Sequence, residues 1–87
     1  MIKGKTKSGF EFEVPKKMLD NYELVENLSE LESNPLLLTK IVVQILGKKQ
    51  SEDLKDFLRD EDGIVPVTKM EKEVTEILSY REETKNY

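Results

Sequence analysis

Cysteine and histidine are both missing from the 87 residues of this chain. Without cysteine, neither a disulfide bond nor a thiolate zinc site can stabilise the fold. Without histidine, the commonest general base and the commonest metal-ligating side chain are absent. No glycine-rich phosphate loop and no serine nucleophile elbow occurs either. We therefore expect no catalytic residue, no metal, no other cofactor and no enzymatic activity.

A long hydrophobic run is also lacking. The longest apolar-rich stretch, residues 36–46, is interrupted by Thr39, Lys40 and Gln44, and it is shorter than the roughly 20 residues that span a bilayer. The first residues carry lysines and glycine with no apolar core of a signal peptide. These features predict a soluble, cytoplasmic protein with no membrane partner.

Basic residues are fewer than acidic ones. The chain has 14 Lys and Arg residues and 18 Asp and Glu residues, for a formal net charge of −4. The basic residues are interspersed with acids, apart from the pairs Lys16-Lys17 and Lys48-Lys49. An acidic chain repels phosphate backbones, so we expect no nucleic-acid partner. The length predicts one domain, residues 1–87, with a small core.

The N-terminal 15 residues alternate between apolar and polar side chains, which is the period of a half-buried strand. We predict a β-hairpin over residues 1–15, with Gly9 at positive φ in its turn and Pro15 ending it. The apolar face would comprise Phe10, Phe12 and Val14. An isolated hairpin is marginal in water, so this face should pack on the helical remainder of the chain.

Helical spacing of apolar residues then predicts about four short helices over residues 20–80. The first would have Asp20 as its N-cap and Glu23 in the capping-box position, and would end near Ser33. The other three would cover residues 35–46, 49–59 and 68–80, with N-terminal signals at Asn34-Pro35 and Thr68. Residues 81–87 lack periodicity and should fray. The expected fold is mainly α (α+β).

The predicted second helix is apolar around nearly its whole circumference. Such a helix usually lies in a core, yet a chain this short has little protein to surround it. The helix is therefore either core or a partly exposed protein-binding surface. The candidate partner-binding residues are Leu36, Leu37, Ile41, Val42 and Ile45.

An acidic segment after the third helix partly matches a calcium-binding loop. With Gly63 at the invariant position 6, Asp60 and Asp62 take ligand positions 3 and 5. Position 1 is then Leu58, and position 12, which needs a bidentate glutamate, is Lys69. We therefore interpret the segment as an acidic connector between two helices, and a vestigial calcium module is the weakest alternative.

Three segments of the chain occur in a recognisable order. They are residues 19–26 (Leu-Asp-Asn-Tyr-Glu-Leu-Val-Glu), an apolar helix from Asn34-Pro35 to Leu46-Gly47, and residues 58–67 (Leu-Arg-Asp-Glu-Asp-Gly-Ile-Val-Pro-Val). This order resembles the small tail assembly chaperones of long-tailed bacteriophages and their prophages. The resemblance extends from about Phe10 to Leu78, and the chain departs from the pattern at Lys48-Lys49, where acidic residues are commoner.

The resemblance implies a non-enzymatic assembly factor. Such chaperones bind the long helical tape-measure protein, keep it soluble and help to recruit tail-tube subunits. They act in the host bacterial cytoplasm and are absent from the mature virion, and a homo-oligomer is a further possibility for a protein that coats a filament.

The alternative function is that of a small acidic adaptor or anti-host protein that binds a basic partner. It requires Glu23, Glu26, Glu30 and Asp60 to form one contiguous acidic face. Binding of that kind would weaken strongly with added salt.

Overall fold

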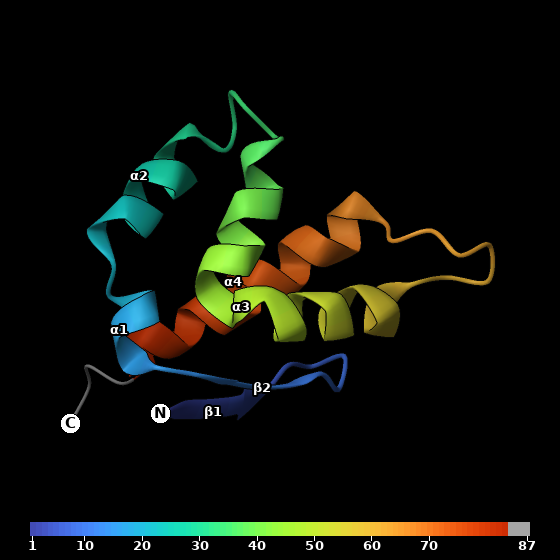
Figure 1. The fold of residues 1–87 in the computed structure, drawn as a ribbon, viewed down its shortest axis with the longest axis horizontal. Coiled ribbons are helices and arrows are strands. Elements are labelled where there is room, and N and C mark those ends of the chain that lie inside the picture. The colour runs from blue at the N-terminus through green and yellow to red at the C-terminus, as the bar shows by residue number, and fades with distance from the viewer. Residues whose placement is uncertain (84–87) are drawn as a thin grey trace.

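An N-terminal hairpin packs against a set of helices in the computed structural model, which describes residues 1–83, with side chains for residues 1–80 (Figure 1). The elements in chain order are β1 (Ile2–Lys5), β2 (Glu11–Val14), α1 (Lys16–Leu19), α2 (Tyr22–Glu30), α3 (Leu37–Leu58) and α4 (Val67–Glu83). The predicted α+β class with an N-terminal hairpin is confirmed. The predicted helix count is wrong, because the described residues hold three helices longer than the single turn α1.

The two strands of the hairpin are antiparallel, with Ile2 opposite Val14 and Gly4 opposite Phe12. The turn forms because Gly9 adopts a φ of 104°, which side chains other than hydrogen disfavour. The amide of Thr6 donates to the Phe10 carbonyl at 2.9 Å and closes the loop. The predicted apolar face of β2 is buried as expected from the alternation.

Helix α2 begins one residue later than predicted. Its N-cap is Asn21, whose Oδ1 accepts a hydrogen bond from the Glu23 amide at 2.9 Å. Asp20 cannot take that position because it ends the preceding turn, α1, where its own amide donates to the Lys17 carbonyl. The helix also ends at Glu30 rather than near Ser33, with residues 31–33 forming a turn.

Helix α3 joins the predicted second and third helices into one kinked element. Gly47 alone departs from helical geometry, with φ 79° and ψ 169°. Side chains of the next turn bond carbonyls at the kink: Gln50 Nε2 donates to the Leu46 carbonyl at 3.0 Å, and Ser51 Oγ donates to the Gly47 carbonyl at 2.6 Å. We call residues 37–46 the first arm and residues 48–58 the second arm.

The start of α3 is a tight turn over residues 34–36. The amides of Leu37 and Leu38 donate to the carbonyls of Asn34 and Pro35 at 3.0 and 3.1 Å. Regular helix therefore begins at Leu37, two residues after the predicted start.

Helix α4 is longer than predicted at both ends. It begins at Val67, so Thr68 lies within it and is not its N-cap; the Met70 amide donates to the Pro66 carbonyl. Its C-terminal end is at Glu83, which corrects the prediction of a frayed tail for residues 81–83. Residues 84–87 lie outside the described part of the chain.

One apolar core joins the buried face of the hairpin to α3 and α4. Tyr80, near the end of α4, packs its ring edge-to-face on Phe12 with ring centroids 5.0 Å apart. The contact is so close that a Cβ on Gly4 would lie 2.6 Å from the Tyr80 ring. No helix among residues 1–83 is long and apolar enough to cross a membrane.

Both outer edges of the hairpin are partly occupied by side chains. On β2, the Gln50 amide accepts from the Glu13 N–H and donates to the Glu13 carbonyl, each at 2.8 Å. On β1, the Tyr80 hydroxyl accepts from the Lys5 N–H at 3.3 Å and donates to its carbonyl at 3.1 Å. These side chains take hydrogen-bonding positions that a further strand would need.

Candidate interaction groove

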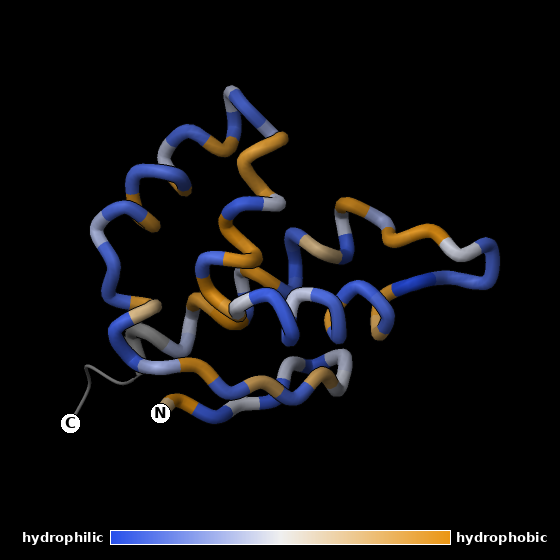
Figure 2. Tube along the Cα trace, viewed as in Figure 1, coloured by the Kyte–Doolittle hydropathy of each residue, from blue (hydrophilic) through white to orange (hydrophobic). Residues whose placement is uncertain are grey.

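A groove of about 250 Å³ opens between the two arms of α3 and the start of α4. It forms because the kink at Gly47 turns the second arm away from the first, while the chain returns from the second arm into α4 (Figure 1). The apolar lining residues are Leu38, Val42, Val43, Val65, Val67 and Met70. Figure 2 shows apolar segments on both the first arm and the approach to α4. We call this surface the apolar groove.

The remaining wall of the apolar groove is polar and belongs mainly to the second arm. Lys48, Glu52 and Lys55 line it, together with Ser51. Lys55 pairs with Glu52 at 2.7 Å. Lys48 has no ion-pair partner within the part of the chain that the structure describes. This wall therefore carries a local excess of positive charge on an acidic protein.

The structure separates the five residues predicted to contact a partner. Val42 lines the apolar groove although only 5% of it is exposed. Leu36 is 82% exposed in the turn before α3, and Leu37 is half-buried against the core. Ile41 and Ile45 are 0% and 2% exposed and belong to the core. The first arm is thus mostly core, and the accessible part of the predicted set is small.

Sequence reasoning missed the apolar residues that the groove takes from outside the first arm. Val65 and Val67 flank Pro66 directly after the acidic turn, and Val67 is 60% exposed. Within the first arm, Val43 is 49% exposed but is absent from the predicted set. A helix that is apolar on all sides has no polar face, so the sequence does not show which of its residues are exposed. The sequence signal for this wall is the pair of valines on either side of Pro66.

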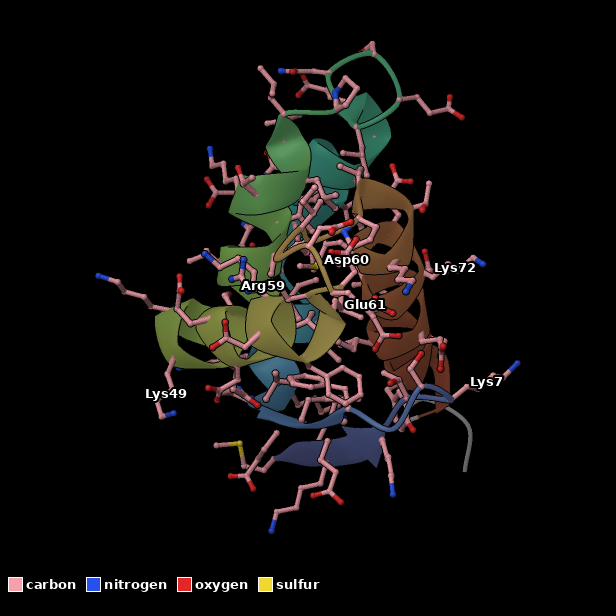
Figure 3. The ribbon with its side chains drawn as sticks, turned by 90° about the vertical axis from the view of Figure 1, so that its right-hand side faces the viewer. Lys7, Lys49, Arg59, Asp60, Glu61 and Lys72 are labelled. Carbon is pink, nitrogen blue, oxygen red and sulfur yellow. The ribbon has the colours of Figure 1, made fainter. Side chains whose placement is uncertain are left out.

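The acidic segment is built as a self-contained turn. Asp60 Oδ1 accepts from the amides of Asp62 and Ile64 at 2.9 and 3.0 Å. Gly63 has φ 80°, and its carbonyl accepts from Arg59 Nη1 at 3.0 Å. The Asp60 carboxylate therefore accepts hydrogen bonds from backbone amides of its own turn. Figure 3 shows this turn at the front of the molecule. Within residues 1–83, no three acidic side chains are grouped to hold a metal ion.

The carboxylates required for an acidic docking face do not come together. Glu23, Glu26 and Glu30 are exposed on α2, which lies at one end of the long axis in Figure 1. The loop that carries Asp60 lies at the opposite end. The four residues do not form one contiguous surface.

A further pair of carboxylates holds the hairpin turn on α4. Glu73 is 2% exposed, and its Oε2 accepts from Ser8 Oγ at 2.8 Å, while Oε1 has no hydrogen-bond partner within the described residues. Glu76 Oε2 accepts from the Lys7 amide at 2.8 Å. These contacts join segments that are more than 60 residues apart in sequence.

A comparison of the chain with protein-family models, with curated proteins and with solved structures finds no match. A function for this chain therefore has to come from its residues and their geometry.

Proposed function

We propose that this protein is a non-enzymatic tail assembly chaperone of a long-tailed bacteriophage or prophage. In this role it binds the tape-measure protein, keeps it soluble in the host cytoplasm and helps to recruit tail-tube subunits before it leaves the assembly. The apolar groove beside the kink of α3 is the observation that carries the proposal.

The shape of the groove suits a helical partner. A cavity of about 150 Å³ holds a benzene-sized group, so 250 Å³ accommodates about two large apolar side chains of a helix. A helix satisfies its own backbone hydrogen bonds, and its i, i+3 and i+4 side chains can enter such a groove. Strand addition is less favourable, because Gln50 and Tyr80 already bond the edges of the hairpin.

A contact of this size also suits a temporary role. An apolar contact of a few side chains is weak by itself and gains strength only when repeated along a long partner. Tail-tube subunits can then displace individual chaperone copies without breaking one large interface. Acidic net charge keeps the free protein soluble.

Co-expression with a tape-measure protein tests the proposal. We expect a soluble complex with many copies of this chain in size-exclusion chromatography with light scattering. Val43→Glu should abolish the complex, because it places a carboxylate in the apolar groove. Ile64→Glu is the matched control: Ile64 is 59% exposed but does not line the groove.

If the tape-measure protein stays insoluble while the wild-type chain elutes alone, the chaperone proposal is wrong. If the complex forms equally with Val43→Glu and Ile64→Glu, the chaperone role stands and the groove is not its binding site. Circular dichroism of both variants establishes that they are folded.

A further inference from the structure

We propose that a second cleft, between the hairpin turn, the end of α3 and α4, binds an arginine side chain of a partner protein that has an acidic residue beside it. We call it the Glu73 cleft. It shares no lining residue with the apolar groove, so the proposal is independent of the function proposed for the groove. The observation that points to a ligand is the buried carboxylate of Glu73, which has an unpartnered oxygen.

The Glu73 cleft takes its walls from three segments and has a volume of about 450 Å³. Ser8 belongs to the hairpin turn, Phe57 to the last turn of α3 and Glu73 to α4. The segments are joined by the packing of Phe57 on Phe10, with ring centroids 5.5 Å apart, and by the hydrogen bond from Ser8 to Glu73. A cavity of about 150 Å³ holds a benzene-sized group, so this cleft is large enough for an arginine side chain.

The Glu73 carboxylate is incompletely hydrogen-bonded. Its Oε2 accepts from the Ser8 hydroxyl at 2.8 Å, and its buried Oε1 has no partner within the described residues. A buried carboxylate with too few donors is costly. Ser8 is exposed, so its hydroxyl can bond water instead. A stronger donor can then replace it, while the carboxylate turns toward the cleft about a bond with a broad torsional preference.

A guanidinium group matches what Glu73 needs. Its planar fork donates two parallel hydrogen bonds to one carboxylate, and such charge-assisted bonds are about twice as strong as neutral ones. Phe57 supplies a face on which the guanidinium can stack, because its ring lines the cleft and is 45% exposed. An ammonium group is not planar and makes no bidentate contact, so arginine should bind better than lysine.

Two other charged residues of the cleft already have partners. Arg59 donates to the Asp56 carboxylate at 3.2 Å and to the Gly63 carbonyl at 3.0 Å. Glu76 Oε2 accepts from the Lys7 amide at 2.8 Å. The charged groups that remain for a ligand are therefore the Glu73 carboxylate and two lysines.

The two lysines determine what must accompany the arginine. Lys69 and Lys72 line the cleft and are exposed, and neither has an ion-pair partner within the part of the chain that the structure describes. They repel a cation that arrives alone, and they attract a carboxylate. The ligand that fits all three groups is an arginine with an aspartate or glutamate next to it.

NMR titration of the isotope-labelled protein with capped tripeptides tests the proposal. We expect the peptide Glu-Arg-Glu to shift the amide signals of Ser8, Phe57 and Glu73 saturably, with a Kd of about 1 mM. The peptide with lysine at the centre should bind at least about fivefold more weakly, and the peptide with uncharged citrulline should not bind. The proposal is overturned if either of these binds as tightly as the arginine peptide, or if the arginine peptide does not saturate by about 20 mM.

Glu73→Gln tests the residue itself. It removes the charge but keeps an oxygen that can accept from Ser8, so the fold should persist, and binding of Glu-Arg-Glu should weaken at least about tenfold. Glu76→Gln is the matched control, because Glu76 lies on the same helix, lines the same cleft and also bonds the hairpin turn. It should bind like the wild type. Equal binding by the two variants overturns the assignment of Glu73.

Lys69→Glu/Lys72→Glu gives a second readout that does not alter any buried group. This variant should bind Glu-Arg-Glu more weakly than the wild type and Ala-Arg-Ala more tightly, because the cleft then repels the acid and attracts the cation. Lys16→Glu/Lys17→Glu is the matched control: it changes the net charge equally, at residues outside the cleft, and should change neither affinity by more than about twofold. If both peptides respond in the same direction to the cleft variant, or if the control reverses them as fully, the proposed ligand is wrong.

Discussion

Replacement of Gln50 by leucine should destabilise the protein more than its partial exposure suggests. The side chain makes three hydrogen bonds at once: two to the backbone of Glu13 at 2.8 Å and one to the carbonyl of Leu46 at 3.0 Å. It therefore connects the edge of β2 to the last carbonyl before the kink at Gly47 in α3.

The expected cost depends on how each bonded group is solvated in the variant. A hydrogen bond contributes about 0.5–1.5 kcal/mol net, and a buried acceptor left unpaired costs about 1–3 kcal/mol. Glu13 is exposed, so its N–H and C=O can bond water instead. Leu46 is only 6% exposed, so its carbonyl is less easily hydrated. We expect Gln50→Leu to lower the free energy of unfolding by about 2 kcal/mol, which corresponds to a decrease in Tm of about 8–16 °C.

Urea denaturation followed by circular dichroism measures this change. Gln44→Leu is the matched control, because Gln44 lies in the first arm and makes one side-chain hydrogen bond, to Asn27; its loss should cost about 1 kcal/mol or less. Gln50→Glu should be at least as destabilising as Gln50→Leu, since it keeps one acceptor but turns a carboxylate oxygen toward two carbonyls. A Gln50→Leu variant no less stable than Gln44→Leu would refute the reasoning.

Three further substitutions test local geometry. Gly4→Ala should destabilise by about 1–3 kcal/mol, because the new methyl group would lie 2.6 Å from the Tyr80 ring. A gain in Tm would contradict the packing, since alanine inside a strand is otherwise more favourable than glycine. Gly47→Ala meets no atom within 4 Å, yet φ 79° and ψ 169° suit only glycine, so a loss of about 1–3 kcal/mol in denaturant unfolding is expected from backbone strain alone. Asp60→Ala should lose about 1 kcal/mol and speed hydrogen exchange of two turn amides, whereas Asp60→Asn keeps the acceptor and should change little; equal effects would show that the side-chain oxygen is not the stabilising group.

The sequence predicted those features that local patterns determine. Alternation of apolar residues predicted the hairpin, and Gly9 was correctly assigned to its turn. The absence of calcium ligands at Leu58 and Lys69 pointed to a connector, and the structure has a turn that Asp60 closes with its own oxygen. In each case the deciding interactions lie within a few residues of one another.

The features that the sequence could not predict depend on contacts between distant residues. Glycine at position 47 marks an interruption between two predicted helices, but the bonds of Gln50 to both Leu46 and β2 join residues that the local pattern does not connect. Likewise Ile41 and Val43 have similar side chains in one apolar helix, and only the tertiary packing buries the first and exposes the second. The groove needs residues from both arms of α3 and from residues 65–70, so no single helical pattern contains it.

The attachment of the hairpin to α4 imposes an order on folding during synthesis. The hairpin is translated first, but the groups of α4 that hold it, Tyr80, Glu76 and Glu73, come 65 to 75 residues later than their partners. A two-stranded hairpin is marginal by itself, so its apolar face waits for most of the chain to leave the ribosome. Contacts of such long range slow folding. The last helix to be made therefore completes the first element of the fold.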